Sequence, residues 1–320
     1  MKMTTSLSAL LLTIAGLFIT PTHAASLAPL AYVPNEKSGS ISIIETTMQK
    51  VVDTITIGGA PRGIAVSPDG KLLYVSDRNA SGLVVLDLSS QKITTRIPLG
   101  ESPEGVSISP DGRWVVAAIE LTNSVAFIDT ATQRVDFSIK TSGKNPEHAE
   151  FSPDGRWLLV SAEEADSVDV IDIAARQQVK SITVGARPRG IGFLPNGSQA
   201  YVACELPGMV YVIDMATQAV VKTIKAGNFA NGMAVAPNGK HVFISNGRDA
   251  SVSVIDVANQ QIVATIPVGN RPWGLAVTPD GSHAYVANGR SNSVSVIHAG
   301  TYQTIATIPV GEAPWGVVIH

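Results

Sequence analysis

The sequence predicts an all-β fold of seven four-stranded units arranged in one ring, and three observations lead to this expectation. A turn, Ser67-Pro68-Asp69-Gly70, returns along the chain in similar form, and successive copies are 42 or 43 residues apart. An acidic residue that follows two apolar ones recurs with the same period, first at Glu45 and then at Asp87. Between these markers lie short runs of β-branched and other apolar residues without helical periodicity.

A constant period of roughly 40 residues with strand-like content is typical of a β-propeller, in which each repeat forms one four-stranded blade. The glycines that close the recurring turns are Gly70, Gly112, Gly155, Gly197, Gly239 and Gly281. The acidic marker continues through Asp129, Asp172, Asp214 and Asp256, and His298 takes its place in the last copy. We therefore predict a single seven-bladed β-propeller over residues 25–320.

The repeat over residues 60–101 illustrates one blade. Its four strands are expected at residues 63–66, 71–76, 83–86 and 92–98. The turn 67–70 suits type I geometry, because proline presets the second position and glycine accepts a left-handed backbone. Asp87 follows the third strand, where its carboxylate can accept hydrogen bonds from the next backbone amides.

The two ends of the chain differ in phase, and this difference predicts how the ring closes. The repeats begin with a second-type strand at residues 31–33 and end with a first-type strand at 316–319. Each strand type occurs seven times only if the last strand joins the first three in one blade. Such closure hides the exposed strand edges that an open array would present for aggregation.

Residues 1–24 precede the repeats and resemble a secretory signal peptide. Lys2 is followed by a mostly apolar run at 7–19, and small residues end at Ala24. The run is shorter than the roughly 20 residues that a membrane span needs. We therefore expect cleavage after Ala24 and a periplasmic or secreted protein.

The composition argues against several classes of partner. The formal net charge is −3 and basic residues do not cluster, which makes nucleic acid and anionic membranes poor partners. Cys204 is the only cysteine, so no internal disulfide forms, and we expect this residue in the core. We expect a monomer.

Several segments resemble a known repeat. Tyr32-Val33, Tyr74-Val75 and Tyr285-Val286-Ala287-Asn288 look like the YVTN-type β-propeller repeat, over essentially the whole mature chain. Pro103-Glu104-Gly105 and the ending at 313–318 look like a narrower subgroup, the exported propellers associated with pyrroloquinoline-quinone-dependent alcohol catabolism. That second resemblance implies an accessory role beside a periplasmic quinoprotein, and it carries no catalytic residues.

The candidate site lies where the loops after the fourth and second strands emerge on one face. One side chain per blade follows a proline-type position near the axis. In chain order these are Arg62, Glu104, Glu147, Arg189, Asn231, Trp273 and Trp315. The set divides into a charged arc and an aromatic arc. One interpretation is structural: Arg62–Glu104 and Glu147–Arg189 are ion pairs between neighbouring blades, and the two tryptophans pack against blade edges.

His148 stands where six repeats have glycine, beside a one-residue insertion in the loop 141–145. If glycine serves a left-handed backbone there, a longer loop could let His148 fit without strain. Alternatively, Glu104, Glu147 and His148 could line an acidic pocket that takes a divalent cation. Nearby loops would add Glu120, Glu163 and Glu205 to this pocket. This alternative would make the protein a metal-dependent hydrolase or lactonase.

The sequence contains no Gly-x-Ser-x-Gly elbow, phosphate-cradling loop or Cys/His cluster. The preferred interpretation is a non-enzymatic exported module without a cofactor or metal. It would bind a protein or small-molecule ligand through the face that bears Trp273, Trp315, Arg248 and Arg290.

Overall fold

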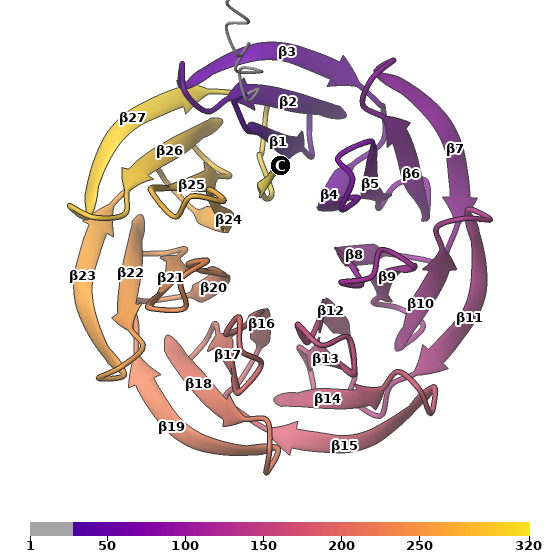
Figure 1. Ribbon diagram of the computed structural model, residues 1–320, viewed down its shortest axis with the longest axis vertical. Coiled ribbons are helices and arrows are strands. Elements are labelled where there is room, and N and C mark those ends of the chain that lie inside the picture. The colour runs from indigo at the N-terminus through magenta and orange to yellow at the C-terminus, as the bar shows by residue number, and fades with distance from the viewer. Residues whose placement is uncertain (1–27) are drawn as a thin grey trace, which may run out of the picture.

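Seven four-stranded antiparallel sheets stand around a central axis in the computed structural model, which describes residues 28–320 (Figure 1). The predicted signal peptide lies outside the described residues. Within residues 28–320, no helix has the length and apolar character that crossing a bilayer requires.

Each blade contributes four strands, from the axis outward. The innermost strands are β4 (Pro61–Val66), β8 (Pro103–Ile108), β12 (Pro146–Phe151), β16 (Pro188–Phe193), β20 (Ala230–Val235), β24 (Pro272–Val277) and β28 (Val318–Ile319). The second strands are β1 (Leu30–Asn35), β5 (Leu72–Asp77), β9 (Trp114–Ile119), β13 (Trp157–Ala162), β17 (Gln199–Cys204), β21 (His241–Asn246) and β25 (His283–Asn288). The third strands are β2 (Ser40–Glu45), β6 (Gly82–Asp87), β10 (Ser124–Asp129), β14 (Ser167–Asp172), β18 (Met209–Asp214), β22 (Ser251–Asp256) and β26 (Ser293–His298). The outermost strands are β3 (Lys50–Thr56), β7 (Lys92–Pro98), β11 (Arg134–Lys140), β15 (Gln177–Thr183), β19 (Ala219–Lys225), β23 (Gln261–Pro267) and β27 (Gln303–Pro309).

The predicted closure of the ring is confirmed. The C-terminal strand β28 pairs with β1, so that one blade has the order β28-β1-β2-β3. Ala31 lies opposite Ile319 in this antiparallel pair. Beyond the strand, the amide of Leu30 donates to the carbonyl of His320 at 2.7 Å. The two ends of the propeller therefore hold each other through backbone hydrogen bonds.

The recurring turns have the predicted geometry. The amide of Gly70 donates to the carbonyl of Ser67 at 2.8 Å, and Gly70 has a φ of 68°. The Asp87 carboxylate accepts from the amide of Ser90 at 2.7 Å. In the last blade, Nδ1 of His298 accepts from the following backbone instead, which explains how histidine replaces the acid.

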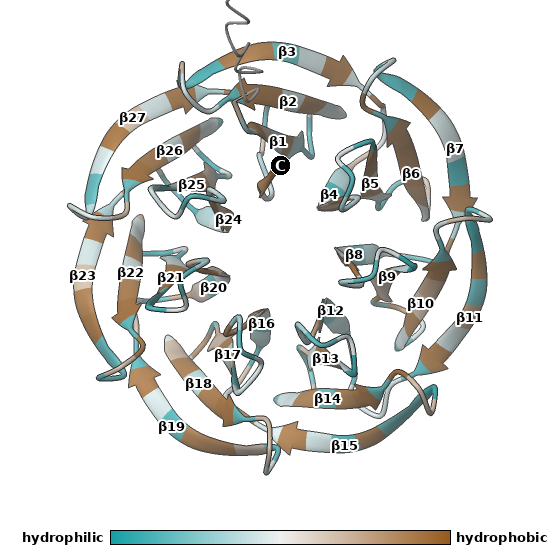
Figure 2. Cartoon of the chain, viewed as in Figure 1, coloured by the Kyte–Doolittle hydropathy of each residue, from teal (hydrophilic) through white to brown (hydrophobic). Residues whose placement is uncertain are grey.

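The core lies between neighbouring blades, where the second and third strands are buried on both sides. These strands appear as mostly apolar bands in Figure 2. Tyr74 of β5 and Val115 of β9, for example, belong to one buried cluster that joins two blades. Cys204 is buried within such a cluster, and burial raises the pKa of its thiol to about 12. This confirms its interpretation as a core residue.

The left-handed backbone that was considered as one reason for the Pro-x-Gly glycines is not present. The glycines of the Pro-x-Gly positions, such as Gly63, do not have a left-handed backbone. Instead, a Cβ on Gly63 would lie 2.2 Å from the carbonyl oxygen of Glu104 in the next blade. The inner strands of adjacent blades approach closely, and this requires glycine at 63, 105, 190, 232 and 274, whereas a Cβ on Gly316 would meet nothing within 4 Å. A left-handed backbone does occur just before the inner strands, among other places, at Ser102, Asn145, Arg187, Phe229, Arg271 and Ala313.

Candidate functional site

Two kinds of loop meet at one end of every blade, which we call the loop face. One kind enters an inner strand, and the other joins the second and third strands of the same blade. Backbone hydrogen bonds connect them: Gly247 donates to the carbonyl of Phe229 at 2.8 Å, and Gly289 donates to that of Arg271 at 2.9 Å. The recurring Ser-Pro-Asp-Gly turns lie at the other end, which we call the turn face.

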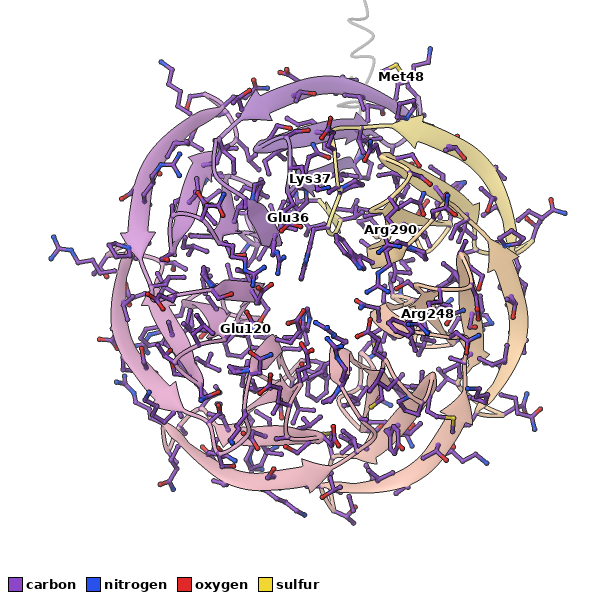
Figure 3. All side chains as sticks on the ribbon, turned by 180° about the vertical axis from the view of Figure 1, so that it is seen from behind. Glu36, Lys37, Met48, Glu120, Arg248 and Arg290 are labelled. Atoms are coloured by element: carbon purple, nitrogen blue, oxygen red, sulfur yellow. The ribbon has the colours of Figure 1, made fainter. Side chains whose placement is uncertain are left out.

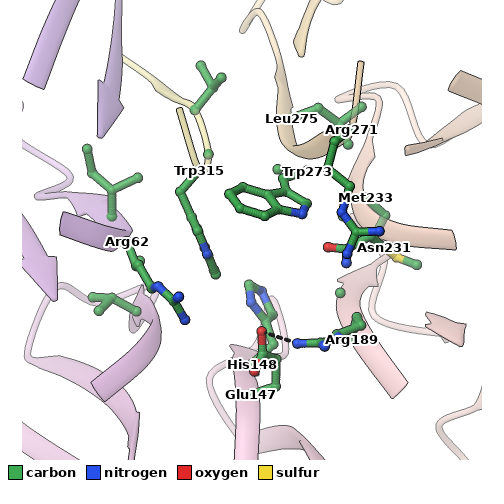
Figure 4. A pocket seen from close by; sticks show the side chains of 18 residues that line it. Arg62, Glu147, His148, Arg189, Asn231, Met233, Arg271, Trp273, Leu275 and Trp315 are labelled. Atoms are coloured by element: carbon green, nitrogen blue, oxygen red, sulfur yellow. Dashed lines mark ion pairs between the residues drawn. The ribbon is translucent and has the colours of Figure 1, made fainter. Parts of the chain in front are cut away.

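A cavity of about 250 Å³ lies on the axis between the inner strands, and we call it the axial cavity. The predicted residues that line it are Arg62, Glu147, His148, Arg189, Asn231, Trp273 and Trp315. Arg271 and Met233 line it as well, although neither residue was predicted from the sequence to lie in the site. Figure 4 shows the two tryptophans on one side and Glu147 with Arg189 on the other. Glu104 is fully buried and is not part of the lining.

The predicted ion pair between Arg62 and Glu104 is present. Nη1 of Arg62 lies 2.6 and 2.7 Å from the two carboxylate oxygens of Glu104, and its Nε lies 2.9 Å from Glu36. Burial and repulsion from Glu147 raise the pKa of Glu104 to about 7, although Arg62 opposes this shift. Arg62 is thus held by two carboxylates beside the cavity.

The second predicted pair, Glu147–Arg189, belongs to a larger cluster. Nη1 of Arg189 lies 2.5 Å from Glu147 and 3.0 Å from Glu163, and its Nη2 lies 3.3 Å from Glu205. Burial, together with repulsion from Glu147, raises the pKa of Glu163 against the pull of Arg189. Arg271 joins this cluster through Glu205, with Nη2 at 2.9 Å from Oε1. Ion pairs thus continue from Arg189 through Glu205 to Arg271, which lies beside Trp273.

The acidic pocket predicted around Glu104, Glu147 and His148, with Glu120, Glu163 and Glu205 from nearby loops, is present only in part. His148 instead places Nε2 3.7 Å from Glu150. The carboxylates that do converge are Glu120, Glu147 and Glu163, each with an oxygen within 4.8 Å of the others. Their donor type suits a hard divalent cation. However, the guanidinium of Arg189 already compensates two of the three.

The aromatic side of the cavity depends on glycines in the neighbouring loops. A Cβ on Gly289 would lie 2.9 Å from Cε3 of Trp273, so this position must lack a side chain. The guanidinium carbon of Arg271 lies 6.0 Å from the centre of the Trp273 ring and 5.1 Å from that of Phe229. Both tryptophans line the cavity, and Trp273 lies beside a cation, which does not favour the interpretation that they only pack against blade edges.

Two sequence families match different parts of the chain. Residues 106–180 and 142–304 match the family described as lactonase, seven-bladed β-propeller. The chain belongs to this lactonase family. Residues 23–109 match a second family, described as YNCE-like β-propeller. A search of curated protein sequences found no match.

Solved structures of similar shape cover nearly the whole lactonase-family chain. A chain of Kuenenia stuttgartiensis hydrazine synthase is 26% identical, with a TM-score of 0.77 over 83% of this chain and 91% of that one. A functionally unknown Desulfotomaculum acetoxidans protein is 16% identical, with a TM-score of 0.80 over 91% and 98%. A Bacteroides uniformis protein, provisionally assigned as a 6-phosphogluconolactonase, is 19% identical, with a TM-score of 0.78 over 91% and 99%. The last two share the fold alone. None of these matches supports the narrower quinone-associated subgroup.

In this lactonase-family propeller, the cavity joins an aromatic wall to a wall of paired charges. Asn231 and the half-buried arginines offer hydrogen-bond donors, and among the described residues Glu147 is the only carboxylate in the lining. Pockets of this kind bind ligands through apolar contact and use a few polar groups to orient them.

Proposed function

We propose that the protein is a binding module whose axial cavity holds a small, hydroxylated ring compound, such as a sugar acid or its lactone. The observation that carries the proposal is the placement of Trp273 and Trp315 opposite Arg189 and Glu147 around one cavity of about 250 Å³. Ligand pockets usually measure roughly 300–1,000 Å³, so this cavity suits a ligand no larger than about one sugar ring.

The type of lining supports this class of ligand. The indole rings of Trp273 and Trp315 can pack on the C–H faces of a ring compound, because they are flat and apolar. Asn231 and Arg189 can bind hydroxyl or carbonyl oxygens on the opposite side. The membership of the lactonase family agrees with a ligand of the sugar-acid type.

The pairing of the carboxylates supports binding without a reaction. Glu147 is engaged by Arg189 at 2.5 Å, and Glu104 is buried and held by Arg62. A general base must be within hydrogen-bond reach of the proton that it removes, and it must be able to accept that proton. Neither carboxylate meets both conditions in this arrangement.

We propose for the cellular context that the mature protein starts at Ala25 and works in the periplasm. There it would act as a scaffold or binding accessory beside quinoprotein oxidation of alcohols. This part of the proposal rests on the N-terminal pattern and on the narrower resemblance.

Binding of glucono-δ-lactone and of gluconate to the mature protein tests the proposal. Tryptophan fluorescence or calorimetry should detect saturable binding to the wild type and its loss in Trp273→Ala/Trp315→Ala. Trp157→Ala is the matched control, since Trp157 is a half-buried tryptophan outside the cavity. Equal binding by the double variant would contradict the proposal.

A second candidate function is hydrolysis of a lactone. His148 lines the axial cavity beside Glu147, and Nε2 lies 3.7 Å from Glu150, so it could act as a general base. It would take a proton from water as the oxygen attacks the lactone carbonyl, and the departing ring oxygen would then receive that proton. The product is the hydroxy acid.

A pH-stat assay with glucono-δ-lactone decides this candidate, with and without added Zn²⁺ or Mn²⁺. Hydrolysis above the spontaneous rate that His148→Gln abolishes would favour the enzyme. Activity that requires metal and is lost in Glu120→Gln or Glu163→Gln would favour the metal-dependent form. A wild-type rate equal to the spontaneous rate would exclude hydrolysis of this substrate.

A further inference from the structure

Arg248 and Arg290 occupy equivalent places in neighbouring blades on the loop face. Arg248 lies in the loop between β21 and β22, where its amide donates to the carbonyl of Asn228 at 3.2 Å. Arg290 lies in the loop between β25 and β26, and its amide donates to Asn270 at 3.1 Å. The repeat therefore fixes the two backbones in the same way and presents two exposed guanidinium groups side by side.

These two arginines have no carboxylate partner among residues 28–320, unlike the other arginines near the axis. The equivalent loops of four other blades carry a glutamate immediately after the second strand. These glutamates are Glu36, Glu120, Glu163 and Glu205, and each pairs with an arginine. In the two blades in question, this position is Gly247 and Gly289. The neighbouring Asp249 is already bonded to Asn228.

The absent glutamate side chains make room for other groups. A Cβ on Gly247 would lie 3.1 Å from Nη1 of Arg271, and a Cβ on Gly289 would lie 2.9 Å from Trp273. Glycine in place of glutamate at these two positions thus removes negative charge and leaves space for a third guanidinium, that of Arg271. Figure 3 shows Arg248 and Arg290 on one side of the axis and Glu36 and Glu120 on the other.

The three arginines line one depression of about 490 Å³, which we call the arginine pocket. Phe229 and Asn270 complete its wall. The guanidinium carbon of Arg248 lies 3.7 Å from the centre of the Phe229 ring, which holds this flexible side chain in place. Arg271 lines the arginine pocket and the axial cavity, so the two are adjacent.

We propose that Arg248, Arg271 and Arg290 bind the carboxylate or phosphate group of a ligand whose ring lies in the axial cavity. Guanidinium groups bind both anions through paired charge-assisted hydrogen bonds. Arg248 and Arg290 supply positive charge that no carboxylate of residues 28–320 pairs with, and Arg271 connects this charge to the ring-binding site. The placement of the ring rests on the proposed function; the anion subsite itself does not.

The first test uses inorganic phosphate as the probe, at constant ionic strength, with tryptophan fluorescence and calorimetry as readouts. Arg248→Gln/Arg290→Gln should weaken phosphate binding at least about tenfold, because two of the three guanidinium donors are lost. The matched control is Arg113→Gln/Arg156→Gln, which also removes two arginines, but on the turn face, where each lies over a tryptophan ring as Arg248 lies over Phe229. Unchanged binding in the first variant, or an equal loss in the control, would overturn the subsite.

The second test compares glucono-δ-lactone, gluconate and glucose 6-phosphate as neutral, carboxylate and phosphate probes. Arg248→Gln/Arg290→Gln should weaken an anionic probe and leave the neutral lactone unaffected, and the affected probe identifies the anion. Trp273→Ala/Trp315→Ala should lose the lactone but retain inorganic phosphate. If binding of inorganic phosphate requires the arginines and no ring compound binds, the proposed function fails while the subsite stands. If all three probes bind to Arg248→Gln/Arg290→Gln as tightly as to the wild type, the subsite fails while the proposed function stands.

Discussion

Arg189 places a guanidinium nitrogen 2.5 Å from a carboxylate oxygen of Glu147 across the boundary between two neighbouring blades. The same guanidinium also reaches Glu163 and Glu205. One side chain therefore compensates three carboxylates that the fold gathers near its axis. The stability of this part of the ring and the polar wall of the cavity both depend on it.

Arg189→Ala should destabilise the protein by about 3–5 kcal/mol, because the buried Glu147 would lose its counter-charge. Glu163 and Glu205 would keep only their pairs with Arg187 and Arg271. Urea unfolding at neutral pH measures this, with Arg134→Ala as control, since Arg134 is exposed and has no ion-pair partner within residues 28–320. A loss below about 1 kcal/mol would mean that the cluster behaves like an ordinary surface ion pair.

Gly63→Ala should destabilise the protein by about 3 kcal/mol or more, since a Cβ would lie 2.2 Å from one backbone atom of the next blade and 2.6 Å from another. Gly316 provides a control in the same repeat position, because a Cβ there meets nothing within 4 Å. Gly316→Ala should leave the melting temperature nearly unchanged. Equal effects of the two substitutions would refute close approach as the reason for these glycines.

Glu104 predicts a specific dependence of stability on pH. Its pKa is raised from 4.5 to about 7 in the folded protein, so the folded state binds more protons than the unfolded state between these values. Its contribution to stability is therefore complete below about pH 4.5 and is lost as the pH rises through about 7. Relative to Glu104→Gln, the wild type should lose up to about 3 kcal/mol over this window. A difference between the two proteins that stays constant from pH 4.5 to 8 would contradict the shift.

Deletion of residues 314–320 should open the ring, because β28 and the bonds between Leu30 and His320 would be lost. The exposed edge of β1 should then cause aggregation or unfolding. Size-exclusion chromatography and thermal melting measure this outcome. A truncated protein that stays monomeric and melts like the wild type would show that closure is dispensable.

The fold was predictable because its signals are local. The turn at 67–70 and the marker at Asp87 act within a few residues, and their period counts the blades. The reason for Gly63 could not be predicted, because the carbonyl that this residue must avoid belongs to Glu104, in another blade. Contacts between repeats do not appear in the pattern of a single repeat.

The candidate site was predictable only in part, for the same reason. The alignment of repeats found Arg62, Trp273 and the two ion pairs, since each occupies a constant position. Arg271 was missed because its place in the cavity depends on space left by Gly247. An alignment of the loops after the second strands would have revealed the change from glutamate to glycine in two adjacent blades.

A crystal structure of the mature protein with saturating glucono-δ-lactone tests the central claim most directly. The account predicts the ring in the axial cavity, with the indole of Trp273 or Trp315 on one face and Arg189 or Asn231 in hydrogen-bond contact on the other. A ligand found instead on the turn face, for example beside Trp114 and Arg176, or a cavity that holds only water, would contradict it.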